Sequence, residues 1–165
     1  MDAQGQKISS WPFEKGHRLD LECVPRLPLQ HPGQSLDFSW AASGIPVVTD
    51  RFVQVFERLG LQEVQFLPAR VEGHPEPLFI LNALSVVRCI DDARCDEVRY
   101  WKPEDERPDK LGEYRAVYGL KVDPSLVGSA RIFRPWGWRV ALIVAQEVKD
   151  ALEHARISGT RFVEA

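Results

Sequence analysis

The stretch PVVTDRFVQVFERLGLQEVQFLP, residues 46–68, aligns without a gap to LIVAQEVKDALEHARISGTRFVE, residues 142–164, at an offset of 96 positions. In both stretches apolar residues recur at i, i+3, i+4 and i+7, from Phe52 to Leu59 and from Val148 to Ala155. This spacing places them on one face of a helix. An apolar segment precedes each helix and another follows it. The repeat therefore predicts two similar strand–helix–strand units.

The residues around the two helices predict how each unit packs. Thr49 can cap the first helix by accepting a hydrogen bond from a free amide of its first turn, whereas the second unit has Ala145 there. We expect Leu61 and Ile157 to fold back on their helices after a turn. We expect Phe66 and Phe162 to point into a core from the strands that follow, at 63–68 and 160–164.

The rest of the chain predicts further strands and few helices. Residues 78–90 form an apolar run rich in Val and Ile, and 114–122 alternate in polarity up to Asp123-Pro124. A shorter strand is expected at 130–134, and another around Leu19 and Leu21. Three prolines in 24–33 favour an extended course and disfavour a helix there. The pattern predicts an α+β fold with mainly antiparallel strands, in which an irregular segment, 1–35, packs on a domain at 36–165.

Composition bounds the function classes. The chain has 165 residues, 44% of them hydrophobic, which suits one domain with a substantial core. A net charge of −3 argues against direct nucleic-acid binding, which needs a basic face. Three cysteines (Cys23, Cys89 and Cys95) without a CxxC pair indicate reduced thiols. We found neither a signal peptide nor a membrane span of about 20 apolar residues, so we expect a cytoplasmic protein.

The sequence offers no familiar catalytic constellation. The four histidines, His17, His31, His74 and His154, are scattered, and none belongs to an HExxH or Cys–His motif. Neither a P-loop nor a nucleophile elbow is present. The carboxylates Asp91, Asp92, Asp96 and Glu97 are typical of hard-cation ligands, but the spacing and glycine of an EF-hand loop are absent. We therefore predict no enzyme, no cofactor and no metal; a hydrolase whose residues converge only in space remains an alternative.

The most unusual segment is acidic. Residues 91–113 hold nine carboxylates and five Lys or Arg, a formal charge of −4. Tyr100 and Trp101 lie in its middle, and Pro103 and Pro108 break any helix. Aromatic anchors ringed by charge suit a protein interface, because Tyr and Trp provide contact area and charge steers the encounter. The simpler interpretation is a solvated loop that Trp101 fastens to the body. The candidate interface residues are Asp91, Asp92, Asp96, Glu97, Tyr100, Trp101, Glu104, Asp105 and Glu106.

A second aromatic cluster spans 133–138 and contains Trp136 and Trp138. These rings could form a stacking platform for a sugar or a base, which would make the chain a small-ligand or carbohydrate-binding module. The simpler interpretation, which we favour, is a turn whose rings cover the edge of the core. The first interpretation is the alternative function that we keep.

Several segments together resemble the eleventh immunity family of bacterial polymorphic toxin systems, formerly a domain of unknown function. They are Leu36-Asp37-Phe38, 45–52, 61–68, 78–82, 86–92, 119–123, 132–134 and 142–162. The resemblance covers roughly residues 36–165. The family usually has Ser at the start of each repeated helix; Thr49 is close to this pattern and Ala145 departs from it.

The resemblance implies a cytoplasmic antidote that binds a cognate toxin domain and blocks it without chemistry of its own. It transfers no catalytic residue. A nuclease fits as the target, because an acidic inhibitor can occupy a basic nucleic-acid channel.

Overall fold

The computed structural model describes residues 11–28, 33–41 and 44–165, which form three sheets and a few short helices. The α+β class is confirmed. The largest sheet has five strands in the order β1-β4-β5-β3-β2, and every neighbouring pair except β1–β4 is antiparallel. These strands are β1 (Arg26–Leu27), β2 (Phe38–Ala41), β3 (Ile45–Thr49), β4 (Val64–Val71) and β5 (Leu78–Ala83).

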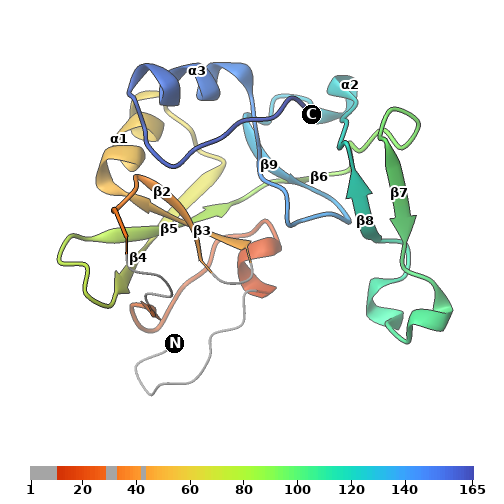
Figure 1. The fold of residues 1–165 in the computed structure, drawn as a ribbon, viewed down its shortest axis with the longest axis horizontal. Coiled ribbons are helices and arrows are strands. Elements are labelled where there is room, and N and C mark those ends of the chain that lie inside the picture. The colour runs from red at the N-terminus through yellow and green to blue at the C-terminus, as the bar shows by residue number, and fades with distance from the viewer. Residues whose placement is uncertain (1–10, 29–32, 42–43) are drawn as a thin grey trace.

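Helices cover one face of this sheet. The helices α1 (Asp50–Arg58) and α3 (Gln146–His154) lie against each other on this face (Figure 1). Their apolar faces meet alternate residues of the strands, such as Val48 and Leu81, in the main core. The two helices that the repeat predicted are therefore present, and the apolar face of each is buried.

The N-terminal segment covers the opposite face. The turn η1 (Trp11–Glu14) buries Phe13 among Val47, Ile80 and other apolar residues. The strand expected around Leu19 and Leu21 is absent. Instead, the backbone of Leu19 exchanges two hydrogen bonds with the side-chain amide of Gln65, at 2.9 and 2.8 Å. The side chain of Gln65 thus pairs with the Leu19 backbone in the way that a neighbouring strand would.

The long apolar run at 78–90 serves two sheets. It is strand in β5, breaks at residues 84–85, and resumes as β6 (Val86–Val87). β6 pairs in parallel with β9 (Ile132–Pro135), which pairs antiparallel with β10 (Ile143–Val144). The remaining sheet is a hairpin of β7 (Glu97–Tyr100) and β8 (Tyr114–Tyr118). The short helix α2 (Pro124–Val127) follows β8.

The two units of the repeat fold alike up to the end of their helices. The first, β3-α1-β4, is complete, and Leu61 and Ile157 are buried as expected. The expected strand at 160–164 does not form. Before it, the backbone carbonyl of Ser158 accepts a hydrogen bond from the amide of Phe38 in β2, at 3.0 Å. The chain then passes over the core, where Phe162 is partly buried.

A buried carboxylate joins the ends of both units. Asp37 accepts hydrogen bonds from the Thr49 hydroxyl at 2.9 Å, from Arg51 Nη1 at 3.0 Å, and from the amide and hydroxyl of Ser158, both at 2.9 Å. The prediction that the Thr49 side chain caps α1 was therefore wrong. Thr49 occupies the cap position, but its hydroxyl donates to Asp37 and accepts no hydrogen bond from the helix.

Candidate functional site

The acidic segment forms a lobe beside the main body. We define the lobe as residues 91–118, which comprise the β7–β8 hairpin and the loop at its tip (Figure 1). Two short turns, η3 (Pro103–Asp105) and η4 (Pro108–Lys110), shape that loop, and each begins at a proline, a residue that fits the first position of a helical turn. The lobe joins the body where the amide of Tyr114 donates to the carbonyl of Gly137 at 3.1 Å.

Two stacked tyrosines lie where the hairpin of the lobe meets the loop at its tip. The rings of Tyr100 and Tyr114 lie 4.7 Å apart, and both hydroxyls donate to the carboxylate of Asp92, that of Tyr114 at 2.6 Å. The hydrogen bond to Asp92 raises the pKa of Tyr100. The pKa of Tyr114 is raised chiefly by burial and also by its own hydrogen bond to Asp92. Of the candidate residues, Asp92 thus has a structural part in the lobe, whereas 41% of Tyr100 remains exposed.

Three of the other six candidate carboxylates have partners inside the lobe. Asp91 accepts from the amide of Arg94 at 3.3 Å, and Glu97 pairs with Arg99 at 2.6 Å. Asp105 accepts from the amide of Lys102 at 2.9 Å and pairs with Arg115 at 2.5 Å. Within the part of the chain that the structure describes, three candidates form neither a hydrogen bond nor an ion pair through the side chain; they are Asp96, Glu104 and Glu106.

The unpaired charge is therefore concentrated at the tip of the lobe. Glu104 lies within η3 and Glu106 directly follows it, and both are exposed. Glu106 has a positive φ of 54°, which is uncommon for a residue with a side chain. Two carboxylates without internal partners remain available to a second molecule.

Trp101 is half-buried at the entrance to the same loop. The guanidinium carbons of Arg107 and Arg115 lie 5.8 and 5.5 Å from its ring centre, within cation–π range. Its backbone amide donates to the carbonyl of Glu113 at 3.1 Å, so the two ends of the loop are closed on each other.

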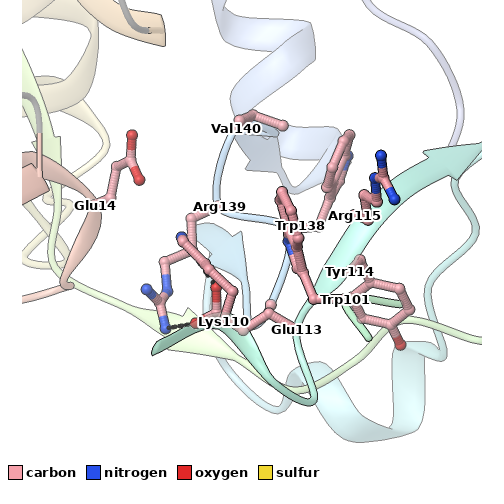
Figure 2. Close-up of a pocket in the computed structure, with 10 residues that line it drawn as sticks. Glu14, Trp101, Lys110, Glu113, Tyr114, Arg115, Trp138, Arg139 and Val140 are labelled. Carbon is pink, nitrogen blue, oxygen red and sulfur yellow. Dashed lines mark hydrogen bonds and ion pairs between the residues drawn. The ribbon is translucent and has the colours of Figure 1, made fainter. Parts of the chain in front are cut away.

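The structure brings Trp101 together with Trp138, which the sequence placed in a separate cluster. Both rings line a surface pocket of about 150 Å³ between the lobe and the body. Figure 2 shows the two indoles near each other, with Arg115 beside them and Glu14 on the opposite wall. The remaining residues of the lining are Lys110, Glu113, Tyr114, Gly137, Arg139 and Val140.

An ion-pair cluster braces this pocket. Glu113 pairs with Lys110 at 3.2 Å and with Arg139 at 2.9 Å, and all three side chains are largely buried. Because Lys110 and Glu113 belong to the lobe and Arg139 to the body, this cluster fixes one against the other.

A buried arginine holds the turn that carries Trp138. Only 1% of Arg134 is exposed, and its guanidinium donates to the backbone carbonyls of Arg139 at 2.5 Å and Gly44 at 3.4 Å. Burial lowers the pKa of Arg134, and the charge of Glu14 acts against that shift. The turn is thus attached both to β9 and to the chain between β2 and β3.

Trp136 does not join Trp138 in a common platform. The guanidinium of Arg88 lies 3.5 Å from the centre of the Trp136 ring, and the pocket is lined by Trp138 without Trp136. The two rings predicted to stack together on a sugar or a base therefore lie in different places, Trp136 against Arg88 and Trp138 in the pocket.

Other sites considered from sequence remain unsupported. In the described residues, no group of three or more His, Cys, Asp or Glu side chains could hold a metal ion. None of the helices described is long and apolar enough to cross a membrane.

Sequence reasoning missed Arg115, Arg139 and Glu14, which line the pocket, and Asp37, which joins the two units. A signal existed only for Asp37, a carboxylate between Leu36 and Phe38 in the segment that carried the resemblance.

Comparison with known protein families identifies a match. Residues 16–165 match the immunity protein family Imm11, so the match begins further upstream than the resemblance at 36–165. A search of curated proteins returns no match. Because the match spans nearly the whole chain, the protein belongs to the Imm11 family of immunity proteins, whose function is toxin immunity.

Proposed function

We propose that this protein acts in the cytoplasm by binding one cognate toxin and covering its active site, and that the lobe at 91–118 forms the contact surface. The inhibition is steric and electrostatic, and the chain contributes no chemistry of its own. The target that fits best is a nuclease, because such an enzyme holds nucleic acid in a basic channel that exposed carboxylates can enter.

The observation that carries this proposal is the lobe itself. It projects beside the body (Figure 1), is fastened by the Glu113 cluster, and presents Tyr100, Glu104 and Glu106 to solvent. A pre-ordered loop loses little conformational freedom on binding, which favours affinity. Tyr100 offers an aromatic anchor, and the two glutamates add charge that can guide the encounter.

The test begins with the toxin. The C-terminal domain encoded by the adjacent gene is expressed alone and together with this protein, and growth and co-purification are measured. Rescue of growth with a stable complex supports the proposal, and the toxin's activity on DNA and RNA then decides whether it is a nuclease. Toxicity that the protein neither relieves nor binds would refute the proposal.

The contact surface is tested on the same complex. Tyr100→Ala is compared with Tyr118→Ala, which removes another exposed tyrosine from the same hairpin. We expect Tyr100→Ala to weaken binding by on the order of 30-fold, as for an anchor residue, and Tyr118→Ala to have little effect. If both substitutions have equally small effects on binding, the toxin does not contact the lobe at Tyr100.

A further inference from the structure

The pocket between Trp101 and Trp138 contains more hydrogen-bond donors than acceptors. Its charged lining is Lys110, Arg115 and Arg139 against Glu14 and Glu113, three positive and two negative groups, or a formal +1. Both oxygens of Glu113 are already engaged, one by Lys110 and the other by Arg139. Glu14 is thus the one acidic side chain of the lining that forms no hydrogen bond or ion pair within the described residues.

Several donors on the residues that line the pocket have no acceptor in residues 11–28, 33–41 and 44–165. Neither indole N–H, of Trp101 or of Trp138, forms a hydrogen bond within the described part of the chain. Nε of Arg139 is buried and has no hydrogen-bond partner among the described residues. Within the part of the chain that the structure describes, the Arg115 side chain forms hydrogen bonds only through Nη1, to Asp105, and more than half of it is exposed. A guanidinium has five N–H donors, so Arg115 can bind a second acceptor without releasing the first.

These features define what the pocket can accept. A cationic side chain would find one acceptor without a partner among the described residues, Glu14, beside three positive groups that are already ion-paired, and an apolar one would leave the donors without partners. A volume of about 150 Å³ is small beside the several hundred Å³ of a typical small-molecule site, and suits the head of one side chain. A carboxylate can accept from both indole N–H groups and from Arg115 together, and its charge is opposite to that of Arg115.

We propose that this pocket receives one carboxylate side chain, an Asp or Glu of the toxin, which the guanidinium of Arg115 and the indole N–H groups of Trp101 and Trp138 bind. This inference rests on the proposed function. It makes the interface one of mixed charge, in which glutamates at the tip of the lobe face basic groups of the toxin and the pocket takes an acidic one. Such an arrangement selects one partner, because a toxin without the acidic residue leaves the donors unpaired.

The experiment measures binding kinetics of the toxin–immunity complex with four variants. Arg115→Gln removes the charge from the pocket, and Trp138→Phe removes one N–H donor while keeping a ring. Arg99→Gln is the matched control, since it removes an exposed arginine of the same hairpin that does not line this pocket. Asp105→Asn tests whether Arg115 acts only by holding the loop, because it breaks the same ion pair and leaves the charge in place.

We expect Arg115→Gln to speed dissociation by on the order of 10-fold or more and Trp138→Phe by a few-fold, with less than about 2-fold change for the two other variants. Each Asp and Glu on the toxin's surface is then replaced by its amide. One of these substitutions should weaken binding to the wild-type protein but add little in the Arg115→Gln background.

The outcomes separate this inference from the function on which it rests. Equal losses for Arg115→Gln and Asp105→Asn, or for Arg115→Gln and Arg99→Gln, would overturn the carboxylate pocket while the complex itself still supports immunity. So would the absence of any coupled toxin carboxylate. Failure of the wild-type protein to bind the toxin would overturn both. Thermal unfolding of each variant identifies losses that come from an unfolded lobe.

Discussion

At the scale of single residues, Asp37 combines burial with four hydrogen bonds to its carboxylate. Burial alone would raise its pKa, but the hydrogen bonds from Ser158 and Thr49 and the charge of Arg51 outweigh it and hold the pKa below the usual value. The ionised form is thus the one that the folded state stabilises.

Replacing this carboxylate should destabilise the fold in a pH-dependent way. We expect Asp37→Asn to lower the free energy of unfolding at pH 7 by about 2 to 3 kcal/mol, because charged hydrogen bonds are lost and buried donors remain. Since the pKa of Asp37 is lowered on folding, its contribution is fully present above about pH 4 and disappears as the pH falls further. Urea unfolding between pH 3 and pH 7 measures this.

The exposed residue Asp20 provides the control, and Asp20→Asn should leave the unfolding free energy within about 0.5 kcal/mol of the wild type. In Asp37→Asn the loss of stability below pH 4 should be smaller than in the wild type. A parallel pH dependence of the two proteins would show that Asp37 is not the group whose ionisation stabilises the fold.

The limits of sequence reasoning are clearest at the same scale. Asp37 binds Ser158, which lies 121 positions further along the chain. The Thr49 hydroxyl could cap the helix, but it donates to Asp37 instead. Local patterns describe what a side chain can do with its neighbours along the chain. They contain no information about a hydrogen-bond partner that is distant in the sequence.

At the scale of elements, the helices were predicted well because each is amphipathic and its apolar period is read directly from the sequence. The strands at 78–90 and 160–164 were predicted less well. Apolar content indicates burial, but it does not say that one run will divide between two sheets at residues 84–85. Residues 160–164 follow Gly159, whose approach to β2 leaves them over the core and without strand partners.

Gly159 allows that approach and should not tolerate a side chain. It has a φ of +87°, and a Cβ there would collide with the carbonyl oxygen of Phe38. Gly73 has a similar φ of +74° with open space around it. We therefore expect Gly73→Ala to cost about 1 to 2 kcal/mol for its backbone conformation and Gly159→Ala clearly more. Chemical denaturation measures both, and equal losses would show that the contact with β2 does not constrain this glycine.

At the scale of the whole molecule, the candidate interface was predicted as a segment but not as a surface. The composition of 91–113 showed where the carboxylates lie in the chain. It could not show how fully Asp92, Asp105 and Glu113 are engaged, because one partner of each, Tyr114, Arg115 and Arg139, lies beyond that segment. Nor could it bring Trp101 to Trp138, since that contact depends on how the hairpin docks on the turn after β9.

This difference between a charged segment and a charged surface decides which residues can steer the toxin. Glu104 and Glu106 are exposed at the tip, whereas Asp105 between them holds the loop through Lys102 and Arg115. A variant that reverses all three charges would also disturb the loop. The double variant Glu104→Lys and Glu106→Lys changes the charge by four units and leaves the bonds of Asp105 in place.

We expect this double variant to slow association with the toxin by on the order of 10-fold at low salt, with little change in dissociation. The effect should shrink as ionic strength approaches about 0.15 M, where the screening length is ~8 Å. The control is Glu72→Lys with Glu76→Lys, an equal change of charge at exposed positions in the turn between β4 and β5, on the other side of the body from the lobe (Figure 1). If both double variants slow association equally, the net charge of the protein guides the encounter; if neither does at low salt, charge has no part in it. Only a selective effect at the tip assigns the steering to the lobe.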